Sequence, residues 1–339
     1  MKKVNFLKEN GKISLVAPSF GCTTEPYKTR LEVAIKNLES EGFVIEQGEN
    51  IFLSNHKVRS NTKRKCAKEF MDAYQSDSSC VISVGGGEIM CEILPYIDFE
   101  LIKKLPHKFF MGFSDNTNLT YTLATISEVP TIYGPNAGSF AFKPFEYDCK
   151  DALDLLMGNK LITHGYDVWE RYKIPTLDPL TRANYSEKKE LRIFPNLHEL
   201  EIQGRLLGGC LDVLQVLCGT KFDHTKEYLE KYQEDGFIWF LEACDLNPVG
   251  IQRALFQLRN AGWFKYVKGF ILGRPLCYRQ KMFGITHYRA IKEALEGLNV
   301  PLIIDADLGH FSPSMPIITG SLAKVSVKDK NISIKYIDL

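Results

Sequence analysis

Apolar and polar positions along the first half of the chain follow two alternating patterns. Short apolar runs that are typical of buried strands are each followed by a longer segment with the spacing of a helix. The strands are predicted at 13–17, 43–45, 80–84, 108–111 and 131–133. The helices between them are predicted at 26–41, 61–74 and 115–126. This alternation predicts a parallel sheet covered by helices, and such sheets bind ligands at the carboxyl ends of their strands.

The alternation is lost between 166 and 200 and then returns. That segment is charged, aromatic and proline-bearing, and long connections of this kind are often functional, so it is either a loop that covers the substrate or a plain linker. After it, strands are predicted at 237–241, 269–272, 302–304, 323–327 and 332–337, and helices at 211–217, 249–261 and 286–298. The predicted fold class is α/β, with an N-terminal parallel-sheet unit at 1–165, a connecting substrate loop at 166–200 and a smaller C-terminal unit with mixed strands at 201–339.

Composition and charge narrow the range of partners. With 339 residues, of which 45% are hydrophobic, the chain is long enough to bury a large core in two domains. Its 42 basic and 41 acidic residues nearly cancel, which argues against nucleic acid or a membrane surface as a partner and favours a small molecule or peptide. The first 20 residues hold only a short apolar run, too short for a secretory signal or a membrane span, so we expect a cytoplasmic protein.

The cysteines give no sign of a metal site. The chain has nine of them, an odd count, with no Cys-x-x-Cys pair and no spacing typical of zinc. We interpret them as reduced, mostly buried, small apolar residues. We therefore expect neither a metal ion nor an organic cofactor.

Three polar residues stand where apolar strands end, and the first is Ser114. The chain leaves the strand at 108–111, passes Gly112 and enters a helix, which is the arrangement of a nucleophile elbow that exposes a serine hydroxyl above a sheet. The segment departs from Gly-x-Ser-x-Gly because Asn116 replaces the second glycine. The alternative is that Ser114 or Asp115 only caps the helix that follows.

The other two are Glu242 and His310. Glu242 directly follows a strand of the second unit and could hold an imidazole in the correct tautomer, although a surface glutamate is the plainer alternative and Asp245 offers a second carboxylate nearby. His310 follows the strand at 302–304 and Gly309, in a polar turn where an imidazole can act as a general base. A purely structural histidine is the alternative, and the chain has seven histidines in all.

A glycine run, Gly85-Gly86-Gly87, follows the predicted strand at 80–84. Successive unhindered N–H groups can bind an anion, either a phosphate or the oxyanion of an acyl transfer. The run matches neither Gly-x-Gly-x-x-Gly nor a Gly-Lys-Ser/Thr ending, which argues against a cofactor phosphate. A tight structural turn and an oxyanion hole are the two remaining interpretations.

Taken together, these segments resemble the LD-carboxypeptidase family of serine peptidases, whose branches include muramoyltetrapeptide carboxypeptidases and microcin C self-immunity peptidases. The resemblance covers nearly the whole chain, and the order and spacing of its motifs support it. The motifs are Val16-Ala-Pro-Ser19, Gly85-Gly-Gly87, Leu94-Pro-Tyr-Ile-Asp98, Gly112-Phe-Ser-Asp115, Gly134-Pro135, Gly204-Arg-Leu-Leu-Gly-Gly209, Phe240-Leu-Glu242, Gly273-Arg-Pro275 and Gly309-His310.

The resemblance implies roles for particular residues. The family uses Ser, Glu and His in this chain order, which maps onto Ser114 as nucleophile, Glu242 as the group that orients the histidine and His310 as base. The oxyanion hole carried over from the family is the backbone N–H of Asp115 together with one from the glycine run, that of Gly87. The family also implies an active site between the two units, no metal or cofactor, and a homodimer.

For the substrate, the resemblance offers two classes. One branch releases the terminal D-alanine of a cell-wall tetrapeptide, and the other cleaves the amide between a peptidyl or aminoacyl group and a nucleotide analogue. Trp169 or Tyr172 in the connection could stack on the base of such a nucleotide, or could pack as a hydrophobic anchor instead. Asn116, Asn118 and Val84 depart from the residues usual in the family, which leaves the substrate open. The competing hypothesis is a non-catalytic small-molecule binding protein that uses the same site, with the glycine run as an anion nest.

Overall fold

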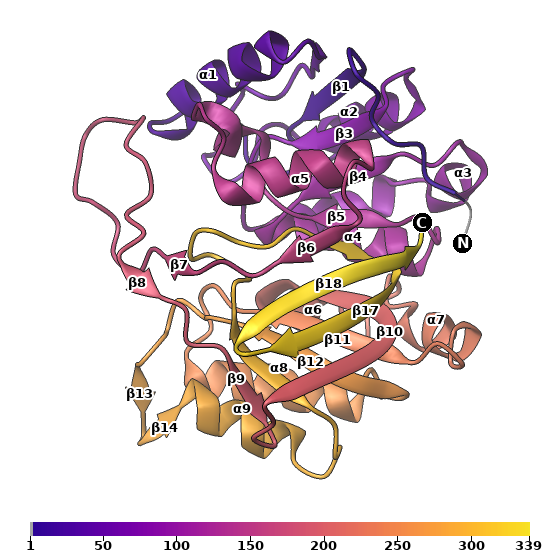
Figure 1. The fold of residues 1–339 in the computed structure, drawn as a ribbon. Coiled ribbons are helices and arrows are strands. Elements are labelled where there is room, and N and C mark those ends of the chain that lie inside the picture. Colours follow the sequence, from indigo (N-terminus) through magenta and orange to yellow (C-terminus); the bar gives the residue numbers. More distant parts are fainter. Residues whose placement is uncertain (1–2) are drawn as a thin grey trace.

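Two β-sheets, one above the other in Figure 1, form the framework of the structure, which is a computed structural model describing residues 3–339. The first sheet has six strands in the order β16-β5-β4-β3-β1-β2. Strands β1 to β5 run parallel to one another, and β16 is antiparallel to β5. Their bounds are β1 Lys12–Val16, β2 Val44–Gln47, β3 Cys80–Ser83, β4 Phe109–Gly112, β5 Thr131–Tyr133 and β16 Ile317–Thr319.

Both faces of this sheet are buried, which explains why its central strands β3 and β4 are almost entirely apolar. Successive residues of a strand point to opposite faces, and those of β4 divide accordingly. Phe109 and Met111 pack into the core that contains α1, whereas Phe110 packs into the core that contains α2. A parallel strand buried on both faces reads as a continuous apolar run. The helices of this layer are α1 Tyr27–Ser40, α2 Lys63–Gln75, η1 Met90–Tyr96, α3 Phe99–Lys104, η2 Ser114–Asn116, α4 Thr117–Thr125, η3 Ala137–Ala141 and α5 Tyr147–Met157.

The second sheet has eight strands in the order β6-β18-β17-β10-β11-β12-β15-β9. Its central strands β10, β11, β12 and β15 are parallel, and antiparallel strands complete both edges. The predicted α/β fold, with a parallel N-terminal sheet and a mixed second sheet, is confirmed. The remaining bounds are β6 Ile162–His164, β7 Val168–Trp169, β8 Glu187–Lys188, β9 Arg192–Phe194, β10 Glu199–Cys210, α6 Leu211–Leu217, α7 Thr225–Lys231, β11 Phe237–Glu242, α8 Pro248–Asn260, β12 Val267–Gly273, β13 Lys281–Met282, β14 Ile285–Thr286, α9 His287–Leu295, β15 Leu302–Ala306, β17 Leu322–Lys328 and β18 Asn331–Asp338.

The sequence predicts no strand between 200 and 210, whereas the structure has the twelve-residue strand β10 there. The prediction is wrong because the second half of β10 contains glycines, which are poor strand residues. Gly208 has a φ of +151°, and an added Cβ would lie 1.7 Å from the carbonyl oxygen of Phe240. The glycine therefore permits a close approach between β10 and β11 that a side chain would prevent.

The two sheets do not correspond to two consecutive halves of the chain, because one strand from each half joins the sheet of the other half. Strand β6, within the predicted N-terminal unit, pairs with β18 and so belongs to the second sheet. Strand β16, within the predicted C-terminal unit, returns to the first sheet and pairs with β5. In Figure 1, β6 lies beside β18 at the level where the two layers meet. Each sheet is thus completed by a strand from the other half of the sequence.

The segment 166–200 is an extended connection that is fixed at several points. Strand β7 pairs with β8, and β9 forms the edge of the second sheet beside β15. Between β7 and β8 the chain makes a long excursion, seen at the left edge of Figure 1. This excursion is held to the first layer because Arg30 of α1 donates a 2.7 Å hydrogen bond to the carbonyl oxygen of Pro179.

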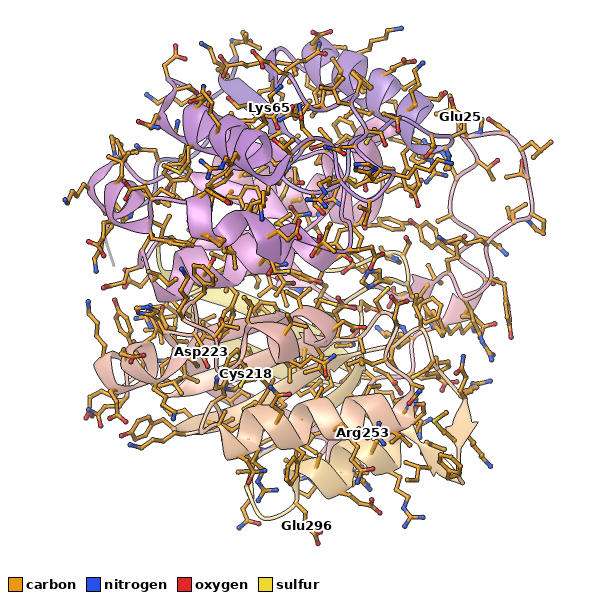
Figure 2. All side chains as sticks on the ribbon, turned by 180° about the vertical axis from the view of Figure 1, so that it is seen from behind. Glu25, Lys65, Cys218, Asp223, Arg253 and Glu296 are labelled. Atoms are coloured by element: carbon orange, nitrogen blue, oxygen red, sulfur yellow. The ribbon has the colours of Figure 1, made fainter. Side chains whose placement is uncertain are left out.

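The outward faces of the helices carry polar side chains. Lys65 of α2 and Arg253 of α8 are exposed, and Figure 2 shows them on the upper and lower layers. Residues 3–339 contain no helix that combines the length and the apolar character needed to cross a membrane.

Candidate active site

Ser114 stands on a sharp turn between β4 and α4. Its φ is +65°, in the left-handed region that costs a non-glycine residue conformational energy. Gly112, two residues earlier, has no room for a side chain, because an added Cβ would lie 2.6 Å from Cγ of Asn116. The strained turn places the serine at the carboxyl end of a central strand, as a nucleophile elbow does.

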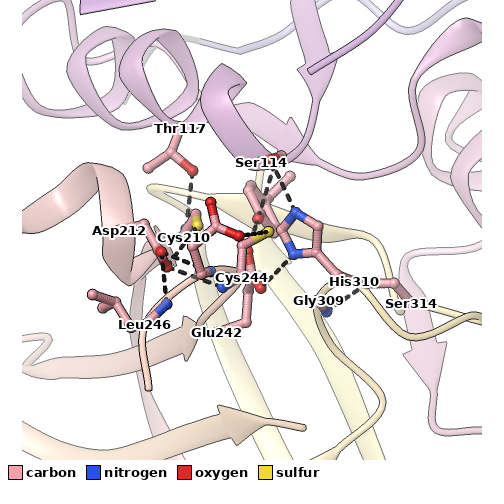
Figure 3. A network of polar contacts seen from close by, with 12 residues as sticks. Ser114, Thr117, Cys210, Asp212, Glu242, Cys244, Leu246, Gly309, His310 and Ser314 are labelled. Carbon is pink, nitrogen blue, oxygen red and sulfur yellow. Dashed lines mark hydrogen bonds and ion pairs between the residues drawn. The ribbon is translucent and has the colours of Figure 1, made fainter. Parts of the chain in front are cut away.

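The Ser114 hydroxyl meets His310 where the two layers join. Oγ of Ser114 lies 2.9 Å from Nε2 of His310 (Figure 3). Nδ1 of the same ring lies 2.8 Å from Oε2 of Glu242. The structure therefore brings together the three residues that the sequence singled out, from the end of β4, the end of β11 and the loop after β15. A hydroxyl, an imidazole and a carboxylate hydrogen-bonded in series can activate the hydroxyl as a nucleophile.

Glu242 is the last residue of β11, and its side chain is fully buried. Its second carboxylate oxygen, Oε1, accepts a 2.6 Å hydrogen bond from the phenol of Tyr133. Burial alone would raise the pKa of Glu242, but the charge of His310 and the hydrogen bonds from His310 and Tyr133 outweigh burial and hold the pKa below its ordinary value. The carboxylate is thus ionised at neutral pH and able to stabilise an imidazolium.

His310 is mostly buried, and its ring packs against Phe113 with ring centroids 5.2 Å apart. Burial alone would lower the pKa of the imidazole, whereas the carboxylate of Glu242 raises it, and the net direction is upward. Gly309 makes this approach possible because its φ is +110° and an added Cβ would lie 2.8 Å from Oε2 of Glu242. The position before the histidine therefore requires glycine.

The glycine run lies directly beside Ser114. An added Cβ on Gly86 would lie 3.3 Å from Cβ and 3.5 Å from Oγ of Ser114. At Gly87 the φ is +150°, and an added Cβ would lie 2.0 Å from Oγ of Ser19. Within residues 3–339, the N–H groups of Gly86 and Gly87 donate to no backbone carbonyl. Backbone donors next to a nucleophile are what an oxyanion hole requires.

The catalytic role predicted for Asp115 concerns its backbone N–H, and its buried side chain holds this region together. Oδ2 accepts hydrogen bonds from Oγ of Ser19 at 2.5 Å and from the N–H of Met90 at 2.9 Å. Oδ1 accepts from the amide of Asn118 at 2.9 Å. Burial raises the pKa of Asp115, and these hydrogen bonds act in the opposite direction. The side chain thus fixes the elbow relative to the segment after β1, which carries Ser19, and to the segment after the glycine run, which carries Met90.

The side chain of Asn116, which stands where the Gly-x-Ser-x-Gly pattern has its second glycine, makes hydrogen bonds that a glycine could not make. Its side-chain amide donates hydrogen bonds to the carbonyl oxygens of Gly85 at 2.9 Å and Phe113 at 3.0 Å. It also lies 3.2 Å from Oδ1 of Asn136. The asparagine therefore ties the glycine run to the elbow from the buried side, where a glycine would make no such contacts.

Negative charge surrounds the histidine. Asp212 accepts hydrogen bonds from the three successive backbone N–H groups of 244–246, which fixes the loop after Glu242. Burial raises the pKa of Glu88, the residue after the glycine run, and the charges of Asp245 and Asp212 raise it further. The charge of His310 lowers the pKa of Glu88, so an ionised Glu88 in turn favours a positively charged imidazole. Among the described residues, no group of three or more potential metal ligands is arranged to hold a metal ion.

Trp169 and Tyr172, the two predicted substrate-binding aromatics, have different environments. Trp169 is 1% exposed, and its indole N–H donates to the carbonyl oxygen of Lys188 at 3.1 Å. Its ring packs edge-on against Phe311, the residue after the histidine, with centroids 5.1 Å apart. In this conformation Trp169 is a hydrophobic anchor. Tyr172 is 61% exposed. Stacking of either ring on a base stays a prediction.

Tyr133 is the site residue that the sequence reasoning missed. Its phenol oxygen accepts a 3.1 Å hydrogen bond from the backbone N–H of Ser114 and donates to Glu242. A signal was available, because Tyr133 is a polar residue at the end of a predicted strand, directly before the Gly134-Pro135 motif. The same criterion identified Ser114 and Glu242.

The chain is thus an α/β protein whose two sheets meet at a serine, a histidine and a glutamate. Residues 13–134 match the profile of the LD-carboxypeptidase N-terminal domain, and residues 203–325 match that of the LD-carboxypeptidase C-terminal domain. The chain therefore belongs to the LD-carboxypeptidase family, which includes the MccF-type serine peptidases, as its motifs predict.

Individual relatives agree with this assignment. The chain is 26% identical over 317 residues to the microcin C7 self-immunity protein MccF of Escherichia coli, covering 91% of this chain and 88% of that protein. The structure of MccF in complex with aspartyl sulfamoyl adenosine is similar with a TM-score of 0.81 and 22% identity, covering 99% of this chain and 98% of that chain. The muramoyltetrapeptide carboxypeptidase of Oxalobacter formigenes gives a TM-score of 0.72 and 20% identity, covering 96% and 99%. The two structural likenesses show the fold.

Proposed function

We propose that this chain is a serine carboxypeptidase or amidase, with Ser114 as nucleophile, His310 as general base and Glu242 as the carboxylate that orients the histidine. The observation that supports this most strongly is the series of two hydrogen bonds from Oγ of Ser114 through the imidazole to Oε2 of Glu242, at 2.9 and 2.8 Å. Membership of the LD-carboxypeptidase family supports the same reaction class.

In the acylation step, Nε2 of His310 takes the proton of the Ser114 hydroxyl while Oγ attacks the carbonyl carbon of an amide. The oxyanion that forms is held by the backbone N–H groups of Asp115 and Gly87. Collapse of the tetrahedral intermediate breaks the C–N bond, and the imidazolium gives its proton to the leaving amine. Glu242 stabilises the imidazolium between these two proton transfers.

In the deacylation step, water takes the place of the amine. His310 removes a proton from the water, whose oxygen attacks the acyl carbon, and the second tetrahedral intermediate expels Ser114 with its proton restored. The product is a free carboxylic acid. The cycle uses only this set of side chains, the backbone donors and water.

The relatives supply two candidate substrate classes. We propose that the chain cleaves either a cell-wall tetrapeptide, releasing its terminal D-alanine, or the amide of a microcin C-like peptidyl or aminoacyl nucleotide. In the second case Tyr172, which is mostly exposed, is the more accessible of the two aromatics for stacking on the base. Trp169 would take that role only after the connection moves, because its ring is buried.

Mass spectrometry of the wild-type protein and of Ser114→Ala tests the reaction. Each is incubated with a muropeptide tetrapeptide and with an aminoacyl sulfamoyl adenosine. We expect the wild-type protein to convert one of them to its hydrolysis product and Ser114→Ala to leave both intact. If the wild-type protein also leaves both intact, the substrate assignment is wrong.

A fluorophosphonate probe distinguishes an enzyme from a non-catalytic binding protein with the same site. An activated serine reacts covalently with such a probe, whereas a serine in a binding site does not. We expect Ser114 of the wild-type protein to be labelled and labelling to be lost in His310→Ala. The absence of labelling in the active preparation would favour the binding protein.

We also propose, on the family resemblance, that the chain works as a cytoplasmic homodimer. Light scattering in solution distinguishes the single chain of 38.6 kDa from a pair.

A further inference from the structure

Tyr133 occupies a position between two members of the proposed triad. It is the last residue of β5, and its side chain is 1% exposed. Its ring packs near Phe113 and Phe240, with centroids 6.4 and 5.8 Å away. The phenol oxygen accepts the N–H of Ser114 at 3.1 Å and lies 2.6 Å from Oε1 of Glu242. The apolar ring thus belongs to the core, and the hydroxyl group belongs to the site.

The chemistry of its two partners fixes where the phenol proton lies. A backbone N–H can only donate, and an ionised carboxylate can only accept. The single proton of Tyr133 therefore points to Glu242, and an oxygen lone pair faces the N–H of Ser114. Burial and the charge of Glu242 both raise the pKa of Tyr133 well above its ordinary value, so the phenol keeps its proton across the working pH range.

We propose that Tyr133 is a positioning residue that couples the nucleophile to the carboxylate of the triad. Its hydroxyl group accepts the N–H of Ser114 and so holds that backbone in its strained left-handed conformation. The same hydroxyl group donates to Glu242 and so stabilises the charge of the carboxylate. A buried carboxylate that loses one of its donors becomes more basic, and a strained backbone that loses its partner can relax. The inference rests on the proposed function, because it concerns the same three residues.

The hydrogen bond between Tyr133 and Ser114 also limits which groups can form the oxyanion hole. The N–H of Ser114 already donates to Tyr133, so it is not available to an oxyanion. The donors must then come from the residue after the nucleophile, Asp115, and from the glycine run beside Oγ. The hydrogen bond to Tyr133 thus agrees with the assignment of Asp115 and Gly87 to this role, which itself comes from the family resemblance.

Tyr133→Phe removes the hydroxyl group and keeps the ring in the core. The pair formed by His310 and Glu242 carries one negative charge before it takes up a proton and none afterwards. Loss of a donor to the carboxylate destabilises the charged state, so the pair takes up its proton at a higher pH. Because His310 must be neutral to act as a base, the acid limb of the reactivity profile moves to higher pH.

The experiment measures the rate constant for labelling of Ser114 by a fluorophosphonate between pH 5 and 10, in wild type and in Tyr133→Phe. This readout requires no knowledge of the substrate. For Tyr133→Phe we expect the plateau rate constant to be lower by roughly 10- to 100-fold, the effect of one hydrogen bond to a charged group. We expect the acid limb to lie about one pH unit higher.

Tyr121→Phe is the matched control. Tyr121 is another fully buried tyrosine, and its hydroxyl lies 2.8 Å from Oγ1 of Thr225, away from the triad. Tyr121→Phe loses one buried phenol hydrogen bond and Tyr133→Phe loses two, so a thermal melt should show a loss of stability in both variants and the larger loss in Tyr133→Phe. Only Tyr133→Phe should change the pH profile.

The outcomes separate this inference from the function on which it rests. A profile for Tyr133→Phe that superimposes on the wild-type profile, with Ser114 still labelled, overturns the role of Tyr133 alone. An equal shift of the acid limb in Tyr121→Phe would likewise overturn it, because the effect would then be a general loss of packing. If the wild-type protein is not labelled at any pH, the proposed function fails and this inference fails with it.

Discussion

A strained backbone conformation at one residue and the lack of a side chain at another bring Ser114, His310 and Glu242 together. Ser114 has a φ of +65°, and Gly309 has a φ of +110°. Gly309 also leaves the space into which Glu242 extends toward the imidazole, since an added Cβ would lie 2.8 Å from Oε2 of that carboxylate. The short distances between the three side chains therefore depend on backbone conformations that few residues adopt.

Gly309→Ala is expected to inactivate the protein by displacing Glu242 from His310. A misplacement of about 1 Å in a catalytic group can cost on the order of 100-fold in rate. We expect a loss of labelling and hydrolysis of at least about this size, together with about 1–3 kcal/mol of stability from the backbone strain. The measurements are the rate of probe labelling and a urea denaturation curve.

Gly219→Ala is the control for the strain alone. Gly219 has a φ of +81°, and an added Cβ would meet nothing within 4 Å. It should lose a similar amount of stability and keep full activity. If both variants lose activity to the same extent, the contact with Glu242 is not the reason.

At the scale of secondary-structure elements, helix α5 holds the loop that carries His310. Asp148 in the first turn of α5 accepts a 3.2 Å hydrogen bond from the N–H of Ser314. Oγ of Ser314 in turn accepts a 2.9 Å hydrogen bond from the N–H of Gly309. Burial raises the pKa of Asp148 to about 6, while the N–H of Ser314 acts to lower it. The helix and the histidine loop are thus linked through one carboxyl group that titrates in an accessible range.

Asp148→Asn tests this link through the pH dependence of stability. Because the pKa of Asp148 is raised in the folded chain to about 6, its favourable contribution is present below its unfolded value of about 3.9 and is lost as the pH rises through about 6. The asparagine has no such dependence. The stability of Asp148→Asn relative to wild type should therefore increase between pH 4 and 7, by at most about 2–3 kcal/mol, in denaturation curves measured at each pH. Parallel pH profiles for the two proteins would contradict a raised pKa at this position.

Across the whole molecule, the two sheets fold as one structure because they exchange strands and share their cores. β6 and β16 each pair with the sheet of the other half. Tyr121 of α4 stacks on Trp263 of the second layer with ring centroids 5.1 Å apart. Oγ1 of Thr117 accepts the N–H of Cys210 at 2.9 Å, directly beside the elbow. Neither layer would keep its edge or its buried face if the other unfolded.

We therefore expect a single cooperative unfolding transition in urea. Circular dichroism reports on both layers, whereas tryptophan fluorescence reports mainly on the second, because Trp239 and Trp263 are fully buried there. The two signals should give coincident curves with the same midpoint. A fluorescence transition at a different urea concentration would show that the layers unfold separately.

The elements that the sequence predicts well are those specified by neighbouring residues. The helix expected at 26–41 is α1, and the strand expected at 108–111 is β4, because apolar spacing over one element decides both. Ser114, Glu242 and His310 could be singled out because each follows a strand, and strand ends are visible in the pattern. Tyr133 meets the same criterion, but its largely apolar ring is also typical of an ordinary core residue.

The pattern of residues along the chain is enough to predict the α/β layers, the polar residues at strand ends and the family. That Ser114 and His310, 196 positions apart, lie 2.9 Å from each other, and that β6 and β16 each join the other sheet, could be seen only in the folded molecule. The physical reason is the separation along the chain of the residues that determine each feature. Helix and strand patterns depend on contacts between near neighbours in the chain, whereas sheet order and the approach of distant side chains depend on how all the elements pack at once.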